Sequence, residues 1–189
     1  MKYLLPILIL ILNVYVISCT SNSKIIEGRI TRNSVDKAYL GMKISELKST
    51  YPNCDFSDLP LYEFGIDSEN IGLLVKKKNK PILFIWTMQG DSTIAGIFCL
   101  TDEFETENKI KVGLSVKDLL LVYPNCSLSR DCLEMASECA EFKDIGITIE
   151  FVTNDKNRVG KYLKDDCNEV TSILDGQRRI DRIVIRKNE

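Results

Sequence analysis

An internal repeat constrains this sequence more than any other feature. Residues 41–54 (GMKISELKSTYPNC) align without a gap with residues 113–126 (GLSVKDLLLVYPNC), at a constant offset of 72 positions. The first glycine, one leucine and the closing Tyr-Pro-Asn-Cys are identical, and three further positions carry conservative changes. The repeat predicts that the chain contains two copies of one structural unit.

Each copy is predicted to begin with a short amphipathic helix. In the first copy, Ile44, Leu47 and Tyr51 have the spacing of residues that share one helix face. Residues 116–123 repeat this pattern with apolar residues at the first, fourth, fifth and eighth positions. Each helix therefore has one apolar stripe to bury.

The ends of the two helices can also be predicted. Pro52 and Pro124 end them, because a proline pushes the preceding residue out of the helical region and has no N–H to donate. At the other end of the second helix, Ser115 and Asp118 have the spacing of a capping box. The first copy has Lys43 in place of that serine.

Strand-like runs follow each helix. Along residues 145–152, apolar and small or polar residues alternate, which indicates a sheet with one buried and one solvated face. The expected strands are 72–75, 82–87 and 94–100 in the first copy, and 145–152, 171–174 and 180–186 in the second. The predicted fold class is α+β, with two tandem repeats, each a short helix or helical pair packed on a small antiparallel β-meander. The predicted repeats are residues 25–109 and 110–189.

The first 18 residues are interpreted as a targeting segment, because a single lysine precedes a long apolar run. The Val-Ile-Ser-Cys sequence that ends at Cys19 resembles the bacterial lipobox, in which the cysteine thiol is lipidated. Residues 19–24 then form a polar tether. Thr20 is not the aspartate that retains many lipoproteins in the inner membrane, so we expect a lipid-anchored protein of the cell envelope, on the outer membrane of a Gram-negative bacterium. An uncleaved N-terminal anchor, or a signal peptide cut elsewhere, remains an alternative.

Six further cysteines agree with export to an oxidising compartment. They are Cys54, Cys99, Cys126, Cys132, Cys139 and Cys167. The favoured pairing joins Cys54 to Cys99, Cys126 to Cys167, and Cys132 to Cys139, although fifteen connectivities are possible. A zinc site is disfavoured, because the sequence has no Cys-x-x-Cys pair and no histidine.

The absence of histidine also removes the commonest catalytic bases and metal ligands. The 25 basic and 27 acidic side chains give a net charge of −2, which does not favour nucleic-acid binding. We therefore expect no catalytic residue, metal or cofactor. An alternative remains open, because two-carboxylate chemistry needs no histidine and Asp165 and Glu169 lie close together in sequence.

The repeated glycine, aliphatic and acidic-aliphatic pattern of the two helical segments resembles the small bacterial lipoproteins of the SmpA/OmlA type. The β-lactamase inhibitor protein family has a related tandem α/β fold. The resemblance implies a noncatalytic module that binds a protein partner at the envelope, anchored to the membrane through Cys19. The alternative is a carboxylate-based enzyme or a carrier of a small ligand in the envelope.

Overall fold

The computed structural model describes residues 25–130, 137–154, 156–162 and 170–187, and these residues form a mostly β protein. Eight strands make one antiparallel sheet in the order β3-β4-β5-β6-β12-β9-β8-β7. They are β3 (Asp55–Pro60), β4 (Ile71–Lys77), β5 (Lys80–Thr87), β6 (Ile94–Cys99), β7 (Ser129–Arg130), β8 (Ser137–Phe142), β9 (Ile147–Val152) and β12 (Arg182–Arg186).

Smaller elements flank this sheet. Two short hairpins are β1 (Ser34–Val35) with β2 (Ala38–Tyr39), and β10 (Gly160–Tyr162) with β11 (Val170–Ile173). The helices are α1 (Ile44–Thr50), the 3-10 helix η1 (Leu61–Phe64) and α2 (Val116–Val122).

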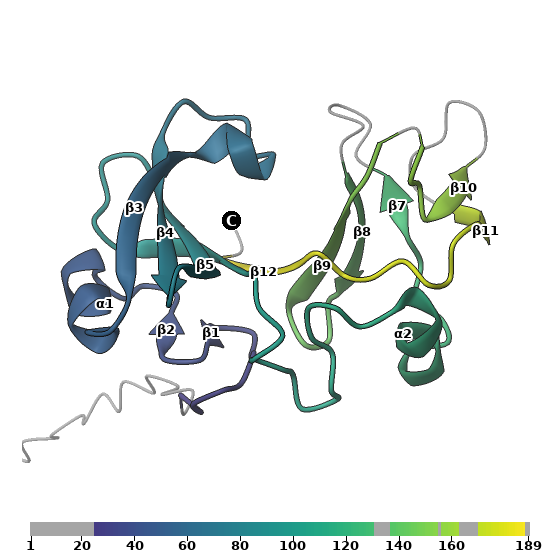
Figure 1. Ribbon diagram of the computed structural model, residues 1–189, viewed down its shortest axis with the longest axis horizontal. Coiled ribbons are helices and arrows are strands. Elements are labelled where there is room, and N and C mark those ends of the chain that lie inside the picture. The colour runs from purple at the N-terminus through teal and green to yellow at the C-terminus, as the bar shows by residue number, and fades with distance from the viewer. Residues whose placement is uncertain (1–24, 131–136, 155, 163–169, 188–189) are drawn as a thin grey trace, which may run out of the picture.

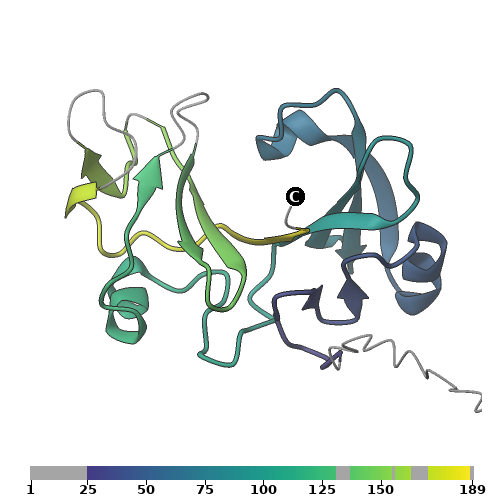
Figure 2. The ribbon, with the colours of Figure 1, turned by 180° about the vertical axis from the view of Figure 1, so that it is seen from behind.

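Strand β12 joins the two halves of the molecule. Its Val184 lies opposite Phe98 of β6 on one side and Thr148 of β9 on the other. In Figure 1 the chain before β12 runs from the second half of the molecule back to the first, and Figure 2 shows the same crossing from behind. The strands that follow α1 and those that follow α2 are thereby hydrogen-bonded into one sheet.

The predicted fold class, two tandem α+β repeats that each have their own small meander, is wrong. The sheet is continuous across both halves, and α1 and α2 are only seven residues long. A separate meander would leave the main-chain N–H and C=O groups along one side of β6 and β12 unpaired. The pairing of these two strands satisfies those groups, and alternating apolar residues do not reveal such a partner.

The predictions of individual helices and strands agree better with the structure. Both helices lie within the matched segments, and each of the six expected runs overlaps a strand. The matched segments also make equivalent main-chain contacts, because Gly41 N–H donates to the carbonyl of Ile94 and Gly113 N–H donates to that of Ile180, both at 2.8 Å. Strands β1, β2, β3, β7, β8 and β10 were not expected.

The main core covers one face of the sheet in both halves. Leu47 of α1 and Leu119 of α2 are fully buried and belong to the same apolar cluster. A second cluster lies on the opposite face of the first half, beneath η1, where Phe64 stacks on Phe84 with ring centroids 3.8 Å apart. The sheet of the first half is therefore buried on both faces.

Candidate functional site

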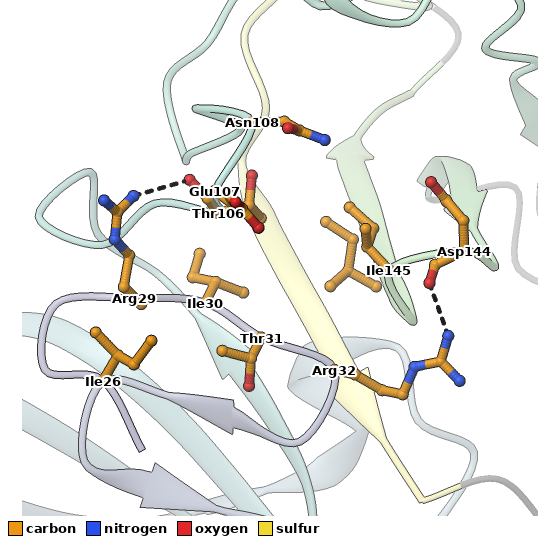
Figure 3. Close-up of a pocket in the computed structure, with 11 residues that line it drawn as sticks. Ile26, Arg29, Ile30, Thr31, Arg32, Thr106, Glu107, Asn108, Asp144 and Ile145 are labelled. Atoms are coloured by element: carbon orange, nitrogen blue, oxygen red, sulfur yellow. Dashed lines mark hydrogen bonds between the residues drawn. The ribbon is translucent and has the colours of Figure 1, made fainter. Parts of the chain in front are cut away.

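A pocket of about 560 Å³ lies between the two halves of the molecule. Three segments that are far apart in the sequence form it, namely the N-terminal segment before β1, the link between the halves and the turn between β8 and β9 (Figure 3). Its lining residues are Ile26, Arg29, Ile30, Thr31, Arg32, Thr106, Glu107, Asn108, Asp144, Ile145 and Ile147. The volume is within the usual range for ligand pockets.

Isoleucines supply the apolar part of this pocket. Ile30 and Ile147 are each only 3% exposed and anchor it in the core. Ile26 is 49% exposed, and Ile145 is partly buried. The pocket therefore offers a preformed aliphatic surface, of which the outer part is in water.

Arg29 holds the N-terminal segment against the link between the halves. Its guanidinium donates to Glu105 Oε1 and to the carbonyl of Thr106, both at 3.2 Å. The main chain adds a further hydrogen bond, from Ile30 N–H to the carbonyl of Glu105 at 2.9 Å. The positive charge of Arg29 is therefore already compensated inside the protein.

Arg32 reaches from the same segment to the second half. Its Nη2 donates to the carbonyls of Lys143 at 3.0 Å and Asp144 at 2.7 Å, in the turn between β8 and β9 (Figure 3). Gly146 closes that turn with a φ of +68°, a conformation that suits glycine. This contact fixes the wall of the pocket that carries Ile145.

Three polar groups of the pocket are available to a ligand. The carboxylates of Glu107 and Asp144 form no hydrogen bond or ion pair with any residue that the structure describes. Asn108 Nδ2 donates to the hydroxyl of Tyr123 at 2.7 Å, whereas its Oδ1 accepts no hydrogen bond within the same described residues. The pocket thus combines an aliphatic surface with two acidic side chains and one amide oxygen. Such a lining can bind a ligand that has both apolar and hydrogen-bonding groups.

Among the described residues, no group of three or more aspartate, glutamate or cysteine side chains is arranged to hold a metal ion. Asp165 and Glu169, the predicted carboxylate pair, lie outside the described residues.

The predicted cysteine sites do not line the pocket. Cys54, Cys99 and Cys126 are free thiols, so the predicted bridge between Cys54 and Cys99 is not formed in this structure. Cys99 is buried in β6 and donates to the carbonyl of Thr101 at 3.4 Å. Burial raises the pKa of the Cys99 thiol to about 12 and that of Cys126 to about 11. It also raises the pKa of Cys54, so all three thiols stay protonated at neutral pH.

The remaining cysteine predictions are not tested by the structure. Cys139 of β8 lies with its Sγ 3.2 Å from Ser129 Oγ. Its predicted partner Cys132, the predicted partner Cys167 of Cys126, and the predicted lipidation site Cys19 all lie outside the described residues. These assignments stay predictions.

Neither α1 nor α2, nor any other helix in the described ranges, is long and apolar enough to cross a bilayer. The apolar run at the start of the chain is not among the residues described.

The pocket was missed by sequence reasoning because its three segments, residues 26–32, 106–108 and 144–147, are 74 and 36 positions apart and share no local motif. One signal was present beyond the recognised repeat. Residues 34–37 (SVDK) and 106–109 (TENK) are also related by the offset of 72, and the second of these segments lines the pocket.

No known protein family and no curated protein matches this sequence. Among solved structures, the crystal structure of the uncharacterized protein yfeY from Escherichia coli is similar, with a TM-score of 0.53. The sequence identity is 14%, and the match covers 86% of this chain and 100% of that chain. At this identity the likeness concerns the fold alone.

Proposed function

We propose that this protein is a noncatalytic, lipid-anchored binding module of the cell envelope, and that the pocket between its halves binds a protein partner. The observation that carries the proposal is the preformed aliphatic surface next to unpartnered polar groups. Fully buried interface cores are apolar and their rims are polar, and the pocket has both. We include in this proposal the resemblance of the two helical segments to SmpA/OmlA-type lipoproteins.

The position of the pocket relative to the proposed anchor supports this function. Ile26 lines the pocket and lies seven residues after Cys19. A fully extended chain spans at most about 3.6 Å per residue, so a lipid on Cys19 keeps the pocket within about 25 Å of its attachment point. A partner in the pocket would therefore be held next to the membrane, as expected for an assembly module on the outer membrane.

A second candidate function, a carrier of a small ligand, is favoured by the volume of the pocket. A pocket of about 560 Å³ has room for a small molecule as well as for a short protein segment. Residues 106–108 of the link and the turn between β8 and β9 would contact either kind of ligand. Cross-linking distinguishes the two, because only a protein partner gives a covalent adduct of higher mass on a protein gel.

The experiment places a photoreactive amino acid in the pocket of the full-length protein in living cells. The probe replaces Glu107 or Ile145 in turn, and Tyr62, which is 65% exposed on η1, serves as the control position. We expect one protein adduct from both pocket positions and none from Tyr62. Adducts from all three positions alike, or none from the pocket, would count against a protein partner.

The anchor is tested separately by labelling cells with radioactive palmitate. We expect the label in the wild-type protein and its loss in Cys19→Ser. Equal label in both proteins would remove the lipid anchor from the proposal and leave the pocket as a binding site to be tested by cross-linking.

A further inference from the structure

In the first half of the molecule, a buried aspartate that contacts Tyr51 also binds the main chain of the N-terminal segment. Asp36 is 6% exposed, and its Oδ2 accepts a 2.9 Å hydrogen bond from the hydroxyl of Tyr51. Its Oδ1 accepts a 2.8 Å hydrogen bond from the main-chain N–H of Gly28. The carboxylate thus holds the N-terminal segment in place through that segment's backbone.

The second half has a related side-chain pair, with a different local backbone and without the bound segment. Asn108 and Tyr123 stand at the offset of 72 from Asp36 and Tyr51, and each pair is 15 residues apart. The two side chains also meet here, but Asn108 is exposed and its Nδ2 donates to the Tyr123 hydroxyl at 2.7 Å, whereas the Tyr51 hydroxyl donates to the buried Asp36. Asn108 Oδ1 takes the place of the oxygen that binds Gly28. Asn108 lines the pocket, and its Oδ1 has no donor among the described residues.

We propose that the pocket takes an extended peptide segment of the partner, and that Asn108 Oδ1 accepts a main-chain N–H of that segment as Asp36 does from Gly28. This inference rests on the proposed function. An aliphatic side chain of the segment packs on the isoleucines, since that surface is preformed and apolar.

Charge defines the next feature of the segment. The guanidinium groups of Arg29 and Arg32 are committed to Glu105 and to main-chain carbonyls. The free charges of the pocket are therefore the carboxylates of Glu107 and Asp144. They favour a lysine or arginine beside the aliphatic residue and disfavour an acidic one.

The test measures binding of three labelled pentapeptides, blocked at both ends, to the full-length protein by fluorescence anisotropy. The first alternates isoleucine and lysine, the second has glutamate in place of lysine, and the third is the first with its backbone nitrogens methylated. We expect the first to bind at least tenfold more tightly than either of the others. Equal binding of the first and third peptides would overturn the inference, because methylation removes the main-chain donor.

Variants of Asn108 test the same contact from the protein side. Asn108→Asp keeps an acceptor oxygen and reproduces the Asp36 and Tyr51 pair, so binding of the first peptide should be retained. Asn108→Ala should weaken it by about threefold to tenfold, the effect of one lost hydrogen bond. Tyr123→Phe is the matched control, since it removes the partner of Nδ2 but leaves Oδ1. Equal affinities for Asn108→Ala and wild type, at unchanged melting temperature, would contradict the assignment.

The two proposals can fail separately. If the pocket cross-links to a protein but no alternating peptide binds up to millimolar concentration, the peptide class is wrong and the proposed function stands. If the pocket positions give no protein adduct, the proposed function fails, whatever the peptides do.

Discussion

The side chain of Arg32 lies directly on Gly146 of the opposite half. A β-carbon at Gly146 would stand 2.5 Å from Arg32 Cγ, closer than real β-carbons approach another atom. The guanidinium of the same arginine donates to the carbonyls of Lys143 and Asp144. The N-terminal segment is therefore fitted to the turn between β8 and β9, and this fit shapes the pocket.

Gly146→Ala should accordingly destabilise the protein more than Gly113→Ala. Both glycines have positive φ, +68° and +83°, so both variants carry backbone strain of about 1–2 kcal/mol. A β-carbon at Gly113 meets nothing within 4 Å, whereas at Gly146 it displaces Arg32 and adds about 1 kcal/mol or more. Urea unfolding measures both. In an Arg32→Ala background the extra cost at Gly146 should disappear, and an undiminished cost would show that the contact is not its cause.

The aromatic layer on the other face of the first half depends on Gly96. A β-carbon there would stand 1.9 Å from the indole of Trp86, which lies across the glycine. We expect Gly96→Ala to cost about 2–3 kcal/mol through overpacking, with a red shift in the emission of the single tryptophan. Gly176→Ala is the control, because its nearest neighbour would be an ordinary 3.8 Å away. An unshifted emission with wild-type stability would mean that Trp86 is not held this way.

The two helices differ at their N-terminal caps, as the sequence predicts. Ser115 accepts a hydrogen bond from Asp118 N–H at 3.1 Å, whereas Lys43 makes no side-chain cap although its backbone, φ −73° and ψ 142°, has the same extended form. Ser115→Ala should therefore cost about 1 kcal/mol, and Lys43→Ser should stabilise by about 0.5–1 kcal/mol. Lys43→Ala is the comparison in thermal unfolding. If it stabilises as much as Lys43→Ser, capping is not the reason.

Some parts of the structure are determined by residues that are close together in the sequence. The helices, their proline ends and the cap at Ser115 depend on residues within one or two turns, and they were predicted. Strand β3 was missed because Asp55, Asp58 and Pro60 are unusual in strands, but β3 is an edge strand, where proline is tolerated. Alternation identifies strands and faces, but the pairing of Val184 with Phe98 joins positions 86 residues apart.

The candidate site was harder to predict than the fold. Its residues come from three distant segments, which contacts of Arg29 and Arg32 and a main-chain hydrogen bond of Ile30 hold together. Strand β8 was missed because a contact between distant residues buries one of its acidic side chains. Its Glu138 is fully buried, which a strand pattern does not anticipate, and its carboxylate accepts the main-chain N–H groups of Val159 and Gly160 at 2.6 and 2.8 Å.

The buried thiol of Cys99 makes stability depend on alkaline pH. Its pKa is raised by burial from 9.0 to about 12, so the folded state keeps the proton after the unfolded state has lost it. The contribution of this thiol is fully present below about pH 9 and is lost as the pH rises toward 12. Under reducing conditions the wild type should lose up to about 1.4 kcal/mol per pH unit more than Cys99→Val in this range. Parallel pH profiles of unfolding free energy would contradict this.

The central claim, that the pocket between the halves binds a protein partner, is tested most directly by blocking it. The measurement is the amount of partner recovered from formaldehyde-treated cells with full-length Ile145→Glu, compared with Ile71→Glu, an isoleucine 56% exposed outside the pocket. Glu107→Arg, at an exposed position, supplies a second blocking variant if Ile145→Glu lowers the melting temperature. We predict that the partner is lost from the pocket variants and retained with Ile71→Glu. Equal recovery from all of them would contradict the account.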